Sequence, residues 1–294
     1  KADMDNLKLN TSTQAERSLR RNQLLQGATK KMKSADFQKK LTSILMSMGS
    51  TAIAVSGGVD SMTLAHIAQR NLNVPATMFH ALSPAVPREA TERVKRHAKN
   101  SGWQLELINA NEMQDSNYIE NPVNRCFFCK TNLYSRIAQF TSQPILSGTN
   151  LDDLSDFRPG LEAAKDFDVR HPFVEANIGK QNIRLIAKDL GLDDIKELPA
   201  APCLSSRIET GLYVTNEKLV LIDDVERLLR EEFGPGIIRC RVKRVGIVIE
   251  LEETLLNKVD CNLRKRVDNL IKTYGYNKDV EYSSYQQGSA FLRE

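Results

Sequence analysis

The stretch TAIAVSGGVDS at residues 51–61 decides the fold. Its first half is a short apolar run, typical of a strand that is buried on both faces of a parallel sheet. Two glycines follow, and a helical pattern of apolar residues then extends from Ser61 to Arg70. Strand, glycine loop and helix form the repeating unit of a doubly wound α/β fold, in which ligands bind beyond the carboxyl ends of the strands.

The same alternation continues on both sides of this stretch. One helix is predicted before it, and three more strands alternate with three more helices after it, at 36–48, 74–80, 88–101, 103–108, 127–140, 144–147 and 180–190. From Gly148 to Gly179 the chain loses periodicity and gathers Asp, Pro, Gly and Asn, as functional loops do. This alternation predicts a right-handed, doubly wound parallel sheet.

The pattern changes after the PAAP segment at 199–202. A helix, two strands and a second helix are predicted beyond it, at 215–233, 237–243, 246–251 and 255–274. The residues before the first predicted helix are polar, rich in Asn, Gln, Lys, Arg and Ser. We therefore expect a polar leader, an α/β domain and a smaller C-terminal α+β domain, at 1–34, 35–200 and 201–294.

The composition is that of an ordinary globular protein, with 41% hydrophobic and 27% charged residues among 294. Its 41 basic and 37 acidic residues give a net charge of +4, which is too small to indicate nucleic-acid binding. No apolar stretch approaches the roughly 20 residues that cross a bilayer, and no apolar signal core is present. The sequence therefore predicts a cytoplasmic protein with a small-molecule partner, without nucleic acid or membrane.

The hexapeptide SGGVDS lies where the first predicted strand meets its helix. Gly57 and Gly58 let backbone N–H groups approach an anion without interference from a Cβ atom. Ser56 and Ser61 add hydroxyl donors, and the helix N-terminus adds partial positive charge. The alternative is an ordinary glycine turn in which Asp60 caps the helix. The whole hexapeptide resembles the PP-loop of ATP pyrophosphatases, which implies ATP, its magnesium ion and the release of pyrophosphate.

Further polar residues are candidate ligands of ATP. Asp152, Asp153 and Asp156 crowd the loop after the fourth predicted strand, where a magnesium ion carrying ATP could bind. Solvation of an exposed loop explains these carboxylates almost as well. Lys130 follows a pair of cysteines and is positioned to meet the α-phosphate of ATP.

The cysteines indicate sulfur or metal chemistry. Cys126 and Cys129 form a CxxC pair at the start of a predicted helix, where low-pKa thiolates are expected. Such a pair suits a redox couple, a zinc half-site or an iron–sulfur cluster. With Cys203 as a third ligand, an Fe4S4 cluster would keep one iron open to an exogenous sulfide. The alternative for Cys203 is a small buried residue, which is the interpretation we give to Cys240 and Cys261.

Several motifs together resemble one family. They are the PP-loop hexapeptide, the helix from Cys126 to Arg136, SGTN at 147–150, DFRPG at 156–160 and PCLSSR at 202–207. Over residues 36–282 the chain resembles the LarE-type ATP-dependent sulfur transferases, and DFRPG and PCLSSR are the most specific motifs. The resemblance implies that a pyridinium carboxylate mononucleotide is adenylated and then thiolated, as a precursor of the nickel-pincer nucleotide cofactor. It also implies a homo-oligomer.

Two sulfur sources follow from this resemblance. In one variant of the family, a cysteine at the position of Cys203 gives up its own sulfur and becomes dehydroalanine. In the other, cysteines at the positions of Cys126 and Cys129 join it in holding an Fe4S4 cluster that delivers sulfide. All three are present here, so we expect the cluster variant. The expected catalytic residues are Cys203, Asp60 and Arg207.

Arginines supply the expected anion contacts. Arg239 and Arg241 stand two residues apart on a predicted strand, so both project from one face, which suits a dianionic phosphomonoester. A solvated strand face is the alternative. In the family, arginines at these two positions hold the phosphate of the mononucleotide. Motif position places Arg158 and Arg207 near Cys203, where an arginine polarises a carboxylate or binds pyrophosphate.

Two other functions share part of the pattern. A tRNA-thiolating enzyme of the PP-loop class also combines SGGxDS with CxxC, but it would need a broader basic surface or an RNA-binding module. An amide-forming PP-loop synthetase would not need three cysteines. A non-catalytic ATP-binding module is the remaining alternative.

Overall fold

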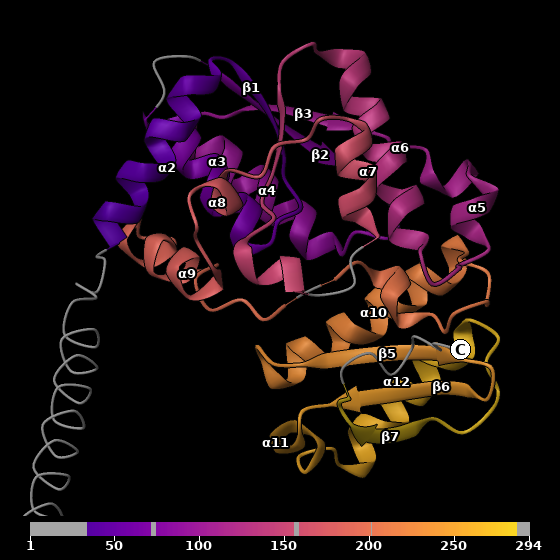
Figure 1. Ribbon diagram of the computed structural model, residues 1–294. Helices are drawn as coiled ribbons and strands as arrows, with labels where there is room; N and C mark the ends of the chain where they lie inside the picture. Colours follow the sequence, from indigo (N-terminus) through magenta and orange to yellow (C-terminus); the bar gives the residue numbers. More distant parts are fainter. Residues whose placement is uncertain (1–33, 72–74, 156–158, 201, 287–294) are drawn as a thin grey trace, which may run out of the picture.

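A computed structural model describes residues 34–71, 75–155, 159–200 and 202–286 (Figure 1). Apart from Ser34, the expected polar leader lies outside the described residues. Asp156 and Arg158 of the DFRPG motif also lie outside them.

A four-stranded parallel sheet has the order β3-β2-β1-β4. The strands are β1 Thr51–Ala54, β2 Ala76–Ala81, β3 Gln104–Ile108 and β4 Ile145–Ser147. All four residues of β1 are buried. Its side chains alternate between two apolar cores, with Ile53 in one and Ala52 and Ala54 in the other. The expected α/β fold, with a parallel sheet buried on both faces, is therefore confirmed at this level.

Helices cover both faces of this sheet. One core lies under α2 (Ser34–Met48), α3 (Val59–Asn71), α4 (Arg88–Ser101) and α9 (Lys180–Asp189). The other lies under α6 (Arg125–Phe140) and α7 (Gly160–Asp166). Shorter helices lie in the connections, namely η1 Glu112–Gln114, α5 Ser116–Ile119, η2 Leu151–Ser155 and α8 Pro172–Glu175. Within the described ranges, no helix combines the length and apolarity that membrane crossing requires.

A second sheet has the order β5-β6-β7. Here β5 (Ile238–Lys243) and β6 (Gly246–Leu251) are antiparallel, and β7 (Glu281–Ser284) is parallel to β6. Its apolar face packs against α10 (Asn216–Phe233) and α12 (Cys261–Thr273). The short helices η3 (Leu204–Arg207) and α11 (Glu253–Leu256) complete this part. Figure 1 shows α10 between the two sheets. The domain boundary at residue 200 stays a prediction.

Two differences from the predicted elements have physical causes. The helix expected at 255–274 is two helices, because the Asp260 side chain accepts a hydrogen bond from the Leu263 N–H at 2.7 Å and begins α12 as its cap. The strand β7 was missed because its sequence EYSS has no apolar alternation, and it lies half-exposed at the edge of its sheet.

Ion pairs join α4 to α10 and so connect the two sheets. Arg88 Nε lies 2.5 Å from Asp223 Oδ2, and Arg88 also pairs with Asp224. Arg230 Nε lies 3.1 Å from Glu89 Oε1. Partly exposed pairs contribute little individually, but a network of them restricts how α4 and α10 can shift against each other.

A buried histidine chain links α3 to α4. His66 Nε2 lies 2.8 Å from His97 Nδ1, and His97 Nε2 lies 2.9 Å from Asp194 Oδ2. Because the carboxylate accepts, His97 donates through Nε2, and with a neutral ring its Nδ1 accepts a hydrogen bond from His66 Nε2. His66 Nδ1 is then left buried, without a hydrogen-bond partner among the described residues. Burial, followed by the nearby His97, lowers the pKa of His66 to about 4.

This histidine predicts a loss of stability in acid. The unfolded chain protonates His66 at its ordinary pKa of 6.5, whereas the folded protein keeps it neutral down to about pH 4. The unfolded state therefore binds protons first as the pH falls, and the free energy of unfolding should drop by about 2 kcal/mol between pH 7 and pH 5 from this residue. Urea denaturation at both pH values measures the drop. In His66→Gln, which cannot titrate, the drop should shrink by that amount; equal drops would contradict the assignment.

Candidate functional site

The SGGVDS loop is held by its own hydroxyl groups. The Ser56 N–H donates to Ser61 Oγ at 3.0 Å, and the two serine Oγ atoms lie 3.1 Å apart. The Gly58 N–H points at Ser56 Oγ, 3.5 Å away. Gly57 has a φ of +83°, in the left-handed region that favours glycine. The loop thus gathers hydroxyl and backbone donors at the start of α3, an arrangement that suits phosphate.

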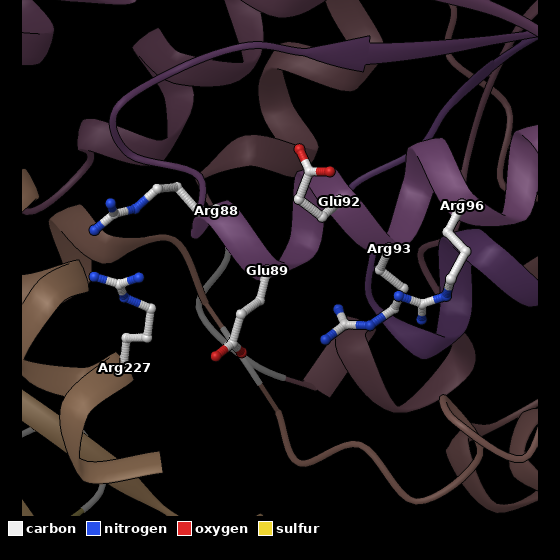
Figure 2. Close-up of a pocket in the computed structure, with 6 residues that line it drawn as sticks. All are labelled: Arg88, Glu89, Glu92, Arg93, Arg96 and Arg227. Carbon is white, nitrogen blue, oxygen red and sulfur yellow. The ribbon is translucent and has the colours of Figure 1, made fainter. Parts of the chain in front are cut away.

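Neighbouring backbone encloses this loop on two sides. A Cβ atom at Gly148, just after β4, would lie 2.7 Å from the Ser61 nitrogen, and one at Gly57 would lie 2.8 Å from the Ala90 carbonyl oxygen. Arg93 of α4 donates from Nη1 to the Gly57 carbonyl oxygen at 2.9 Å. An open hollow of about 430 Å³ adjoins Arg93, and Figure 2 shows its lining by Arg88, Glu89, Glu92, Arg93, Arg96 and Arg227.

Asp60 forms an ion pair that sequence reasoning missed. Its Oδ2 lies 2.6 Å from Nζ of Lys180, which comes 120 residues later at the start of α9. Burial raises the pKa of Asp60, against the opposing effect of Lys180. Asp60 Oδ1 is buried and has no hydrogen-bond partner among the described residues. Mg²⁺ prefers carboxylate oxygens, so this atom fits a magnesium ion carried with ATP.

Asp152 supports α9 from the loop after β4. Its Oδ2 accepts a hydrogen bond from the Lys180 N–H at 2.6 Å. A Cβ atom at Gly179 would lie 3.1 Å from that same oxygen, so the Asp152 carboxylate packs closely against the Gly179 backbone. The contact places Asp152 beside the Lys180 that pairs with Asp60. Its expected contact with ATP stays a prediction.

Lys130 and His171 lie toward the same edge of the sheet. Lys130 Nζ is 5.7 Å from the centre of the Tyr134 ring, and Tyr134 raises the pKa of Lys130 despite burial. His171 Nδ1 lies 2.8 Å from Ser147 Oγ at the end of β4. His171 is within electrostatic range of both Lys130 and Asp153, while burial lowers its pKa. Sequence reasoning missed His171, which lies in the aperiodic region.

The structure brings Cys126, Cys129 and Cys203 together. Each thiol is half-buried and lies within electrostatic range of the other two. Burial, followed by the nearby Cys203, raises the pKa of Cys126 and raises that of Cys129 to about 12. The expected low pKa at the helix start is therefore wrong for the free thiols, because loss of solvation outweighs the helix dipole.

Arg125 is a buried cation beside these thiols. It is 2% exposed, and one terminal nitrogen donates to Asn121 Oδ1. Asn121 in turn donates to the carbonyl oxygens of Glu209 and Leu212 at 2.8 and 2.9 Å. Arg125 Nε and Nη2 are buried without a hydrogen-bond partner among the described residues, although the guanidinium is close enough to Cys126 to oppose the rise in the pKa of that thiol. The sequence analysis missed Arg125, although its position directly before the CxxC pair could have indicated a cation beside the thiols.

Arg207 holds the Cys203 segment. It is 1% exposed, and its Nε and Nη2 bind the two carboxylate oxygens of Glu226 at 2.8 and 3.1 Å. Its Nη1 donates to the carbonyl oxygens of Pro202 and Cys203 at 2.7 and 3.2 Å. Each nitrogen of Arg207 therefore already donates within the protein, and its expected catalytic contact with a carboxylate or pyrophosphate stays a prediction.

Residues around the parallel sheet hold the Cys203 segment from its other side. The Leu204 N–H donates to the Ala85 carbonyl oxygen at 2.8 Å. The Tyr118 hydroxyl lies 2.6 Å from Ser205 Oγ, and both residues are fully buried. Cys203 is thus fixed where the two parts of the chain meet.

Arg239 and Arg241 share one face of β5, but that face is buried. They are 6% and 4% exposed, so the alternative of a solvated strand face is wrong. Arg241 Nε pairs with Glu250 Oε2 at 2.9 Å, and its Nη1 donates to the Ser206 carbonyl oxygen at 3.0 Å. Arg241 is therefore already neutralised within the protein.

Arg239 differs from its neighbour in having no carboxylate within ion-pair distance in the part of the chain that the structure describes. It donates to the carbonyl oxygens of Ile238 and Ala200, both at 2.7 Å. Burial, followed by the nearby Arg207, lowers its pKa to about 10. A buried guanidinium in this state favours an added anion.

The thiols are not placed as ligands of a single ion. Across the described ranges, no group of three His, Cys, Asp or Glu side chains is arranged to hold a metal ion. An Fe4S4 cluster makes a different demand, because each thiolate binds a different iron and the ligands need not converge on one point. Three thiols and the two buried donors of Arg125 fit the sulfur ligands and the negative charge of such a cluster.

Comparisons with known proteins place the chain among relatives. No family model matches it. The uncharacterized protein slr1717 of Synechocystis is 39% identical over 208 residues, 68% of this chain and 75% of that protein. The uncharacterized protein MJ0830 of Methanocaldococcus jannaschii is 30% identical over 230 residues, 77% of this chain and 86% of that protein. The pyridinium-3,5-bisthiocarboxylic acid mononucleotide synthase of Lactiplantibacillus plantarum is 26% identical over 243 residues, 80% of this chain and 86% of that protein. The chain therefore belongs to the same family as slr1717 and MJ0830.

Proposed function

We propose that this protein is an ATP-dependent sulfur transferase that converts a carboxylate of a pyridinium biscarboxylate mononucleotide into a thiocarboxylate, in nickel-pincer cofactor biosynthesis. The observation that carries the proposal is the meeting of Cys126, Cys129 and Cys203 from distant parts of the chain. The name of the Lactiplantibacillus relative, which describes a bisthiocarboxylic acid mononucleotide, supports the same substrate class.

Activation of the carboxylate is the task of the SGGVDS loop. A carboxylate oxygen of the substrate attacks the α-phosphorus of ATP, the bond to the bridging oxygen breaks, and pyrophosphate leaves. The loop's N–H and hydroxyl groups are suited to hold the departing pyrophosphate. Lys180 adds positive charge beside Asp60, whose free oxygen suits the magnesium ion. The product of this step is an acyl adenylate.

Sulfur then replaces AMP on the acyl carbon. We propose that the three cysteines hold an Fe4S4 cluster, whose iron without a protein ligand would supply a labile sulfide. Arg125 lies beside Cys126, and its Nε and Nη2 have no hydrogen-bond partner among the described residues, which suits the negative charge of sulfur ligands. The rival route uses no cluster. In it, the Cys203 thiolate displaces AMP to form a thioester, loss of the Cα proton breaks the Cβ–S bond, and dehydroalanine remains.

Arg239 is the proposed anchor of the substrate phosphate. Among the described residues no carboxylate lies within ion-pair distance of its buried charge, on which Glu226 acts from farther away, whereas Arg241 beside it is paired with Glu250. Of the two predicted phosphate ligands, Arg239 is therefore the one whose positive charge is not neutralised by an ion pair among the described residues.

Mass spectrometry of substrate and protein after one turnover tests the proposal. With ATP and pyridinium-3,5-biscarboxylate mononucleotide, we expect a substrate in which oxygen is replaced by sulfur, together with AMP and pyrophosphate. If the cluster delivers sulfide, each of the single substitutions Cys126→Ala, Cys129→Ala and Cys203→Ala should lower the iron content and stop sulfur transfer. Release of pyrophosphate should continue in all three variants. Cys261→Ala is the control, because that thiol is exposed and distant in sequence.

The rival sulfur source has its own signature. Sacrifice of Cys203 would lower the protein mass by about 34 Da, the mass of hydrogen sulfide, because cysteine becomes dehydroalanine. Iron-free protein that transfers sulfur with this mass loss would overturn the cluster route. Absence of any thiolated product would overturn the proposed function.

Arg125 and Arg207 offer a matched test of two buried arginines. Arg207→Met should lower the free energy of unfolding by about 3 to 5 kcal/mol, because the fully buried Glu226 loses its bidentate partner and keeps a single ion pair with Arg230 at 3.3 Å. Arg125→Met removes a charge that has no ion pair among the described residues, but it also leaves the buried Asn121 Oδ1 without its Arg125 donor, so stability should fall by about 1 to 3 kcal/mol. Urea denaturation of the iron-free variants measures both. Equal destabilisation would make Arg125 a structural residue.

Arg239→Met should weaken binding of the mononucleotide by about 1.5 to 3 kcal/mol, the range for a hydrogen bond to a charged group. Affinity for ATP should stay nearly unchanged. Isothermal titration calorimetry with each ligand measures both, and Arg244→Met is the control, since Arg244 is exposed and pairs with Glu209. A fall in the affinity for ATP, with the affinity for the mononucleotide unchanged, would show that Arg239 contacts ATP and not the mononucleotide.

A further inference from the structure

Arg93 reaches the SGGVDS loop from behind. It lies on α4, and its Nη1 donates to the Gly57 carbonyl oxygen at 2.9 Å. The contact between loop and helix is close, because a Cβ atom on Gly57 would lie only 2.8 Å from the Ala90 carbonyl oxygen. Gly57 also holds a left-handed φ of +83°. Helix α4 therefore packs directly against the SGGVDS loop at Gly57.

The orientation of one peptide group follows from this contact. In a trans peptide the carbonyl and the next N–H point in opposite directions. The Gly57 carbonyl faces Arg93, so the Gly58 N–H faces away from α4. It points toward Ser56 Oγ, which in turn lies 3.1 Å from Ser61 Oγ. Arg93 thus turns the Gly58 N–H to the side where the loop's hydroxyl donors are gathered.

Arg93 differs from the other arginines that line the hollow in Figure 2. Arg88 pairs with Asp223 at 2.5 Å, Arg96 with Asp194 at 2.6 Å, and Arg227 with Asp224 at 3.4 Å. No carboxylate of the described residues lies within ion-pair distance of Arg93. Its charge is partly buried, so water screens it less than it screens an exposed arginine. The Gly57 carbonyl oxygen accepts a hydrogen bond from this guanidinium, while Glu89 and Asp194 act on it from beyond ion-pair distance.

We infer that Arg93 is a positioning residue, which fixes and polarises the Gly57–Gly58 peptide so that the Gly58 N–H is ready to bind the pyrophosphate released from ATP. This inference rests on the proposed function, because it assigns the loop to pyrophosphate. Arg93 itself touches no phosphate. It acts through the peptide: a cation at the carbonyl oxygen strengthens the N–H at the other end as a donor. A donor held in place before the reaction also costs no reorganisation when charge develops.

The test is binding of magnesium pyrophosphate and of AMP, measured separately by isothermal titration calorimetry. Arg93→Met should weaken pyrophosphate binding about tenfold and leave AMP binding within about twofold. Arg93→Lys keeps a positive charge but loses the planar fork, so it should recover part of the loss. The control is Arg96→Met, because Arg96 lines the same hollow and pairs with Asp194 without a contact to the loop. Thermal unfolding of each variant accompanies the titrations.

The outcomes separate this inference from the function on which it rests. If wild-type protein binds pyrophosphate and Arg93→Met binds it equally well, the inference is wrong and the loop assignment stands. If Arg93→Met loses AMP and pyrophosphate alike and Arg93→Lys restores neither, Arg93 is a structural residue and the inference is also wrong. If wild-type protein binds no pyrophosphate, the assignment of the loop fails and the inference fails with it.

Discussion

The buried ion pair between Arg207 and Glu226 is the interaction on which the rest of the site depends. Both residues are almost completely buried, and the contact is bidentate. Removing two charges from water costs free energy, and their attraction offsets this cost only when the contact geometry is good. Displacement of Arg207 from Glu226 is therefore unfavourable. It ties the Cys203 segment to α10, which is itself joined to α4. The position of one thiol relative to the parallel sheet is therefore set by a contact that never reaches solvent.

Unpaired charge distinguishes the places where a ligand is expected. Arg207 and Arg241 are buried and paired with carboxylates. Arg125 and Arg239 are equally buried, yet the described residues offer neither of them an ion pair. Burying a charge without a partner costs stability, and proteins accept that cost mainly at functional sites. Of these two arginines without an ion pair, Arg125 lies beside the thiols, and Arg239 lies on the face of β5 opposite the apolar core of the second sheet.

Much of the fold could be predicted because its signals are local. The strand β1 shows its burial on both faces in four consecutive apolar or small residues, and the SGGVDS loop marks the start of α3. Contacts between distant segments left no such signal. Lys180 meets Asp60 across 120 residues, and the burial of Arg239 depends on segments that cover β5. The prediction of low thiol pKa values was wrong for a similar reason. The helix dipole, worth about 0.3 to 1 kcal/mol, is a local effect, whereas the burial that raises the thiol pKa comes from tertiary packing.

The strand β7 bears on how copies of this protein could associate. An edge strand presents unpaired N–H and C=O groups on its outer side, and a long apolar one invites a second chain to extend the sheet. Here β7 has only four residues, begins with Glu281 and is partly exposed along its length. A neighbouring molecule would gain few backbone hydrogen bonds there and would meet a negative charge at one end. This edge therefore protects the second sheet from uncontrolled extension, and assembly through it would have to rely on complementary side chains.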